Sequence, residues 1–281
     1  MRVNKKTGYT ILEVLIFLAV SSLMFVSAMR AINGRQKQVQ FTQSVREFDA
    51  KIKDVINDVT TSYYPTNKTV DCLVSGGEVV IDDALNETLG TNDDCIYVGK
   101  VIHFQINNNN TTMKIFAMAG KRYSDGNLTP SLSVQDARPK AVSMPGNTSF
   151  IESAEDFTTL YGLRVTRVIR PISNVVFTDY GSLAIISNFG GSSISEAQSV
   201  LIGGIKGSAM GGDVTSALTV INQITDDPAR ATLTGYFEKN TDEGIVICLQ
   251  SPEGKRASIS LGVKGSSSTT LLIDNYNVGC V

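Results

Sequence analysis

The chain begins with a short polar segment, and a long apolar run that contains one charged residue follows directly. From residue 9 to residue 29, every residue except Glu13 is apolar or carries a small hydroxyl group. As an α-helix this run would extend about 31 Å, which matches a hydrocarbon core of about 30 Å. The pattern therefore predicts a membrane-spanning helix at the N-terminus.

A second helical pattern follows the apolar run without a break. Between residues 41 and 63, apolar residues recur at steps of three and four, with charged residues between them. Pro65 ends the pattern, and Gly34 is its weakest point, because glycine costs about 1 kcal/mol relative to alanine inside a helix. Residues 30–64 are therefore predicted to form an amphipathic helix, and we expect its apolar stripe to pack on the chain's own following domain rather than on a partner.

Beyond residue 65 the helical period is replaced by short alternating segments separated by Gly, Asn, Ser and Asp. These segments predict a mainly antiparallel β domain over residues 65–281, so the fold class is α+β. Residues 251–254 predict a turn that joins two strands as a hairpin. Residues 195–224 show no clean period, apart from a possible short helix at 216–223. The predicted strands are 95–99, 101–106, 112–119, 162–169, 174–178, 183–187, 231–237, 244–249, 255–263 and 269–274.

Composition and charge narrow the classes of function. The 281 residues include 25 Lys and Arg and 27 Asp and Glu, and the formal net charge is −2, so the chain lacks the basic character of a nucleic-acid-binding protein. Hydrophobic residues make up 42%, which is enough for a packed core. A single histidine excludes a His-rich metal site, and a catalytic triad would have to use His103.

The residues at the start of the apolar run form a specific string. A short leader with three basic residues ends in Gly8, and Tyr9 and then Glu13 follow within the apolar run. This string resembles the processing site of type IV prepilins and pseudopilins. In that family a basic leader ends in glycine, an aromatic residue follows, and a glutamate is the fifth residue of the cleaved product. Phenylalanine is usual where this chain has Tyr9.

The resemblance implies that a membrane aspartyl peptidase, the prepilin peptidase, cleaves between Gly8 and Tyr9 and that Tyr9 is then N-methylated. Residues 1–8 would be the removed leader, and residues 9–29 the transmembrane and assembly helix. The resemblance also implies that Glu13 accepts the charge of a neighbouring subunit's N-terminal amine, since opposite charges in a low dielectric offset part of each other's desolvation. The other explanation is that Glu13 lies near the membrane interface and its carboxylate reaches water.

The resemblance further implies a pilin-like architecture, in which the long N-terminal helix packs on the antiparallel β domain. The precursor would cross the inner or plasma membrane once, with its N-terminus in the cytoplasm and residues 65–281 outside it or on the cell surface in a filament. The basic leader agrees with this orientation, but Arg30, Arg35 and Lys37 follow the apolar run, so charge alone leaves the orientation open. The closing hairpin is similar to that of H-type minor pseudopilins.

The four cysteines are Cys72, Cys95, Cys248 and Cys280. Because no Cys-x-x-Cys spacing occurs, a zinc ribbon or a thioredoxin-type motif is unsupported. Outside the cytoplasm two disulfides are expected, and three pairings are possible. We favour sequential pairing, in which each bridge stabilises the fold by about 3 to 4 kcal/mol on the loop-entropy model. The other interpretation is four buried free thiols.

Other candidate sites have simpler explanations. His103 is predicted to be a structural residue of a strand, because no Gly-x-Ser-x-Gly elbow is present. The glycine-rich stretch 203–208 lacks the Gly-Lys-Ser/Thr order of a phosphate loop. The acidic pairs at 82–83, 93–94 and 226–227 lack EF-hand spacing, so we expect turn carboxylates rather than calcium ligands. No catalytic residue, metal site or cofactor is predicted.

The sequence therefore predicts a structural protein and not an enzyme. The resemblance to prepilins implies the function of a minor pilin or pseudopilin in a type IV pilus-like filament or a type II secretion pseudopilus. The expected partners are the prepilin peptidase, other pilin or pseudopilin subunits and, before assembly, membrane lipid. One alternative is a membrane-anchored surface module for binding or adhesion that does not polymerise. A secreted enzyme with a signal peptide cut near Met29 is a weaker alternative, since the sequence shows no catalytic constellation.

Overall fold

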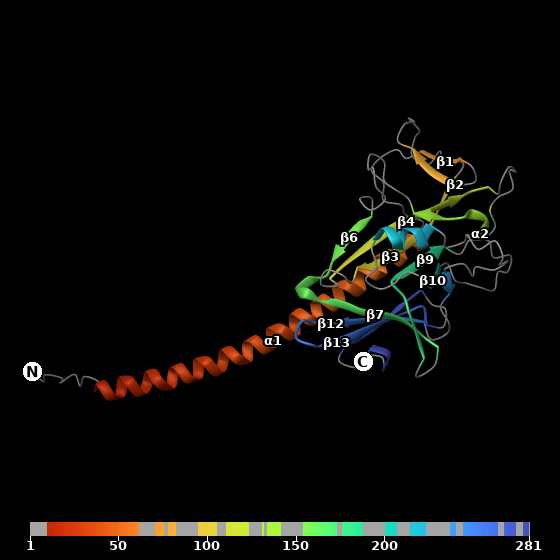
Figure 1. Cartoon of the computed structure of the whole chain (residues 1–281). Coiled ribbons are helices and arrows are strands. Elements are labelled where there is room, and N and C mark those ends of the chain that lie inside the picture. The colour runs from red at the N-terminus through yellow and green to blue at the C-terminus, as the bar shows by residue number, and fades with distance from the viewer. Residues whose placement is uncertain are drawn as a thin grey trace, which may run out of the picture. The chain divides into compact units, whose positions relative to one another are not determined.

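Figure 1 shows a computed structural model of the chain, in which a long helix is followed by a mostly antiparallel β domain, an α+β fold. Contacts divide the chain into two units, Met1–Gln43 and Ser44–Val281. The structure describes residues 10–61, 71–75, 78–82, 95–105, 111–123, 131, 134–141, 154–172, 176–187, 200–206, 214–222, 237–239, 244–263, 267–273 and 278–280.

After α1 most of the described elements are strands, and short helices lie between some of them. The helical elements are α1 (Ile11–Thr60), α2 (Val134–Ala137), η1 (Leu160–Gly162), α3 (Val214–Asn222) and η3 (Val278–Cys280). The strands are β1 (Asp71–Ser75), β2 (Glu78–Asp82), β3 (Cys95–Gln105), β4 (Thr112–Lys121), β5 (Lys140–Ala141), β6 (Glu155–Thr158), β7 (Arg164–Pro171), β8 (Phe177–Asp179), β9 (Ser182–Ser187), β10 (Val200–Ile205), β11 (Phe237–Lys239), β12 (Ile245–Gln250), β13 (Arg256–Leu261) and β14 (Thr269–Ile273).

In the described part of the N-terminal unit, α1 exposes every side chain of its apolar run between Ile11 and Met29. This stretch is long and apolar enough to cross a membrane, and none of it is buried within the chain. A continuous apolar surface of this extent requires contact with lipid or with other protein. The N-terminal helix is therefore the candidate for a single membrane crossing.

In the second unit, the remainder of α1 buries the predicted apolar stripe. The side chains at steps of three and four are at most 1% exposed, and the ring of Phe48 meets that of Phe157 of β6 edge to face at 6.3 Å. The stripe therefore packs on the chain's own β domain, as the sequence predicted. These buried residues are Val45, Phe48, Ile52, Val55 and Val59.

Polar side chains attach the same part of α1 to one strand of each of the two larger sheets. Lys100 of β3 is buried, and its ammonium lies 2.6 Å from an Asp58 carboxylate oxygen. Asp49 is also buried and accepts a hydrogen bond of 2.6 Å from the hydroxyl of Thr269 in β14. Because a buried charge is costly without a partner, these two contacts fix the position of the helix along the domain.

The β domain contains two larger sheets and one ribbon among its described residues. One sheet has the strand order β11-β10-β9-β3-β4-β5, with β6 also paired to β4, and the second has the order β14-β13-β12-β7-β8. The ribbon consists of β1 and β2, and all the described pairs are antiparallel. The predicted closing hairpin is present: β12 pairs with β13, and the Gly254 amide donates to the Ser251 carbonyl at 2.9 Å.

Strands β1, β2, β5 and β6 were not predicted, and two other differences from the prediction arise where glycine allows close packing. The segments 95–99 and 101–106 form the single strand β3, since Gly99 lies at a bulge where an added Cβ would be 2.2 Å from the Ile185 carbonyl oxygen. Strand β10 shows no alternation because all six of its residues are buried. A Cβ at Gly204 would be 2.4 Å from the Tyr180 ring, so the glycine lets this ring lie against the strand.

A polar cluster joins the two larger sheets. The Tyr180 hydroxyl, just after β8, donates to a carboxylate oxygen of Glu238 in β11 at 2.7 Å. Arg170 of β7 donates to the other oxygen of the same carboxylate. Burial is the main cause that raises the pKa of Tyr180, and the hydrogen bond to Glu238 adds to it. The neutral phenol is therefore the form that this cluster stabilises.

We expect Tyr180 to make the fold sensitive to alkaline pH. Because the pKa of Tyr180 is raised in the folded state, its contribution to the free energy of unfolding is fully present below the ordinary tyrosine pKa of about 10. Above that pH the contribution is lost, by up to about 1.4 kcal/mol per pH unit. Urea unfolding between pH 8 and pH 11 measures the effect. The variant Tyr180→Phe should remove most of this slope, and an unchanged slope would contradict the assignment.

Candidate functional site

The first described turn of the chain is a capping box at the start of α1. A single carboxylate oxygen of Glu13, Oε2, accepts hydrogen bonds from the amide and the hydroxyl of Thr10, both at 3.1 Å. In return, the Thr10 hydroxyl oxygen accepts from the Glu13 amide at 3.3 Å. Thr10 is the cap and Glu13 the third helical residue, which is the reciprocal arrangement of a Thr-x-x-Glu box.

This geometry gives a local reason for a carboxylate inside the apolar run. Glu13 satisfies donors that the first helical turn leaves without partners, and its negative charge is favoured at the positive end of the helix dipole. The Thr-x-x-Glu spacing is visible in the sequence and is the local signal of this cap, which the prediction for Glu13 did not include. Gly8 and Tyr9 lie outside the described residues, so the cleavage site and the methylation of Tyr9 stay predictions.

We expect Thr10→Ala to loosen the first turn of α1, because it removes both the hydroxyl donor to Glu13 and the acceptor for the Glu13 amide. Loss of such a cap costs about 1 kcal/mol. Amide hydrogen exchange at residues 11–14 should speed up about fivefold, whereas Thr10→Ser, which keeps the hydroxyl, should exchange like the unmodified chain. Equal exchange in the alanine and serine variants would show that the box contributes nothing.

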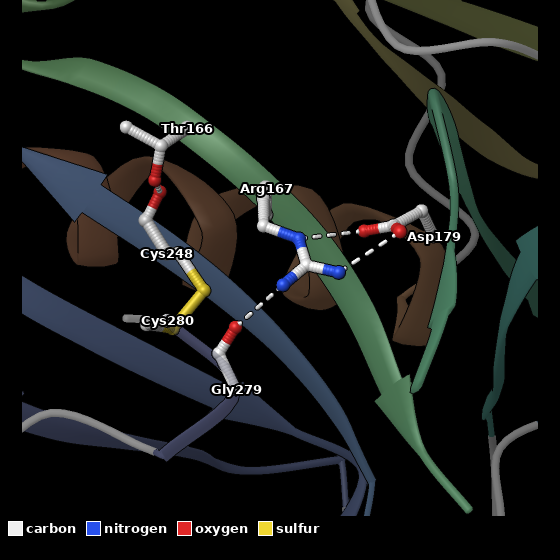
Figure 2. The surroundings of a disulfide bond; sticks show 6 residues. All are labelled: Thr166, Arg167, Asp179, Cys248, Gly279 and Cys280. Carbon is white, nitrogen blue, oxygen red and sulfur yellow. Dashed lines mark hydrogen bonds and ion pairs between the residues drawn. A yellow bond between two sulfur atoms is a disulfide. The ribbon is translucent and has the colours of Figure 1, made fainter. Parts of the chain in front are cut away.

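The second candidate region is the closing disulfide, which joins Cys248 of β12 to Cys280 of η3 across a Cα–Cα distance of 5.4 Å (Figure 2). Sequential pairing predicted this bridge. Both cysteines are buried, and the adjacent Gly279 has no room for a Cβ, which would be 2.3 Å from Ile169. Cys95 is also disulfide-bonded, but the side chain of Cys72 lies outside the described residues, so the Cys72–Cys95 pairing stays a prediction.

Arg167 of β7 connects this bridge to the edge of its sheet, as Figure 2 shows. Its Nε and Nη2 groups each donate to a carboxylate oxygen of Asp179 at 2.9 Å, and its Nη1 group donates to the Gly279 carbonyl at 3.0 Å. The hydrogen bond to Asp179 is the main cause that raises the pKa of Arg167. Through these hydrogen bonds Arg167 holds the C-terminal turn against the sheet, and its guanidinium pairs with the charge of Asp179.

The remaining candidate residues occupy structural positions where they are described. His103 is fully buried in β3, and its Nδ1 lies 2.9 Å from the Ser182 hydroxyl. The glycine-rich stretch begins inside β10 rather than in a phosphate-binding loop. Of the three acidic pairs, only the backbone of Asp82 is described, at the end of β2. No cluster of three metal-ligating side chains occurs among the described residues.

Among the described residues, the main candidate for a functional site is therefore the N-terminal end of α1. There the capped carboxylate of Glu13 lies in the first turn of an exposed apolar helix. In comparisons with protein-family models, with curated proteins and with solved structures, no match to this chain is found.

Proposed function

We propose that this chain is the precursor of a minor pilin or pseudopilin, a structural subunit of a type IV pilus-like or type II secretion filament. A prepilin peptidase cleaves it between Gly8 and Tyr9, Tyr9 becomes N-methylated, and the mature chain leaves the lipid through its apolar helix to join other subunits. Its β domain lies outside the cytoplasm and faces outward from the filament. The proposed role is structural rather than catalytic.

The observation that carries this proposal is the combination of Glu13 with the helix that follows it. The carboxylate stands in the first turn of a helix whose apolar run is exposed throughout, and this helix follows directly on a leader that ends in Gly8. The cap uses oxygen Oε2 of Glu13 for its two hydrogen bonds. We propose that the carboxylate also receives the terminal amine of a neighbouring subunit, because an ammonium in a low-dielectric filament core requires an anionic partner.

The buried half of α1 supports the same function. Ion pairs and apolar packing fix this part of the helix on the β domain, so force applied to the helix is transmitted to the domain. A simple membrane anchor requires no such rigid attachment, whereas a filament subunit does. Lipid is the proposed environment of the exposed helix before assembly, and the corresponding helices of other subunits replace lipid afterwards.

Co-expression of the full chain with a prepilin peptidase tests the proposal. We expect the membrane-bound chain to lose its eight-residue leader, which a shift on a high-resolution gel detects, and to appear in the sheared filament fraction when other pilins are present. The variant Gly8→Leu should remain uncleaved in the membrane, because the family places a glycine directly before the scissile bond. A chain that stays uncleaved but membrane-bound would indicate the non-polymerising anchor instead.

A further inference from the structure

The exposed large apolar side chains of the described β domain are concentrated at a few positions. One group is Leu160 with Tyr161 in η1. The other three lie at opposite edges of one sheet: Leu272 in β14 is 38% exposed, while Ile172 and Val176, at the β7–β8 turn, are 55% and 53% exposed. Strands β14 and β8 are the two outermost strands of this sheet.

Strand β14 is the least protected edge among the described strands. Sheet edges are normally blocked by charge, by proline or by shortness, since their free backbone groups can pair with another chain. The edge strands of the other large sheet are shorter: β6 has four residues, β11 three and β5 two, and the carboxylates of β6 and β11 are paired within the chain. In contrast, β14 has the sequence Thr-Thr-Leu-Leu-Ile, with five residues, no charge and no proline.

The opposite edge, β8, contains one charged residue, Asp179, and this charge is paired. Both carboxylate oxygens of Asp179 accept hydrogen bonds from Arg167, so the charge is paired within the sheet. The neighbouring exposed residue Val176 and the half-buried Phe177 are apolar. Among the described residues, the two edges therefore match in apolar character, and neither β14 nor β8 carries an unpaired charge that would oppose their contact.

We infer that copies of this chain associate head to tail, with β14 of one copy beside β8 of the next, so that this sheet continues from subunit to subunit. Four successive antiparallel pairs separate β14 from β8, so the two strands run in the same direction and would pair in parallel. Such an interface joins two different surfaces and extends into an open chain of subunits in one orientation. A symmetric β14–β14 pair would instead reverse one copy.

The inferred interface also places apolar side chains together on both faces of the sheet. Cross-strand partners share a face, so the register puts Leu272 and Phe177 on the face of Cys248, and Leu271 with Val176 on the opposite face. Pairing of strands of three to five residues buries far less than the roughly 1,200 Å² of a stable interface. The contact is therefore weak by itself, and confinement of the helices in one membrane or filament strengthens it.

This inference rests on the proposed function, because it identifies the contact between subunits of the proposed filament. The test uses the full chain, co-expressed with a prepilin peptidase and other pilins, with Val176→Cys and Leu271→Cys, which share a face, combined in one molecule and treated with a short flexible bismaleimide. We expect a ladder of dimers, trimers and larger species, at least tenfold stronger than from the control Glu253→Cys with Leu271→Cys. Glu253 is also exposed but lies in the β12–β13 turn, away from both edges.

A mixture of the two single variants should give dimers only, because each molecule then offers one reactive edge. Dimers from Leu271→Cys alone would overturn the inference in favour of a symmetric pair, and the absence of a ladder would overturn it altogether. N-terminal cleavage and sedimentation with filaments are measured in the same samples. Cleaved, filament-bound chains without a ladder would refute the edge contact and retain the proposed function, whereas a ladder from uncleaved chains would retain the contact and refute that function.

Discussion

Replacing Glu13 by alanine is expected to reduce incorporation into filaments at least tenfold while leaving cleavage after Gly8 intact. In the proposed filament the substitution would leave a neighbouring terminal amine without its anionic partner, and breaking a buried ion pair costs about 3 to 5 kcal/mol. The measurement is the ratio of chain in the sheared filament fraction to chain in the membrane, determined by immunoblot.

Two matched variants separate the charge of Glu13 from its role in the cap. Glu13→Gln keeps an acceptor for the Thr10 amide but removes the negative charge, since glutamine also completes a capping box. Thr10→Ala weakens the cap but keeps the charge. If the charge pairs with an amine, the glutamine variant fails like alanine and the Thr10 variant assembles. Normal incorporation of Glu13→Gln would show that the cap, and not the ion pair, is what assembly requires.

Removing the Cys248–Cys280 bridge by a double substitution with serine is expected to lower the free energy of unfolding by about 3 to 4 kcal/mol. The bridge closes a loop across a sequence separation of 32, and the loss of this constraint favours the unfolded chain. The loss should also free η3 from the sheet, because Arg167 then holds the C-terminal turn with one hydrogen bond. Urea unfolding of the full chain in detergent measures the difference.

The control for this prediction is Thr166→Val, which removes the hydroxyl that donates to the Cys248 carbonyl at 3.3 Å but leaves the bridge in place. A single hydrogen bond of this kind contributes about 1 kcal/mol. If the serine variant loses no more stability than the valine variant, the bridge is dispensable and the C-terminal turn is held by packing alone.

The elements with strong periodicity were predictable from the sequence. The helix expected over 9–64 is observed as Ile11–Thr60, and its apolar stripe packs on the β domain as predicted. The closing hairpin followed from alternation and from the turn at residues 251–254. In these elements one face is buried and the other is exposed, so the pattern of side chains reports the geometry directly.

Other features depend on contacts between distant residues, which no local pattern reports. Strand β10 is buried on both faces, and its two adjacent glycines are typical of a loop in the sequence. They occur in a strand because the Phe237 and Tyr180 rings lie against them. The pairs Lys100–Asp58 and Thr269–Asp49 join residues 42 and 220 positions apart. The Thr10–Glu13 box is different, because its spacing is local and predictable from the sequence alone.

Mass spectrometry of the N-terminal peptide tests most directly the proposal that the mature chain begins at Tyr9 with a methylated amine. The full chain, co-expressed with a prepilin peptidase and purified from membranes, should give a peptide that starts at Tyr9 and carries one additional methyl group. A peptide that retains Met1 and the basic leader would contradict the proposal and indicate a permanent membrane anchor. A peptide that starts near Met29 would contradict it equally and indicate an ordinary secretory signal.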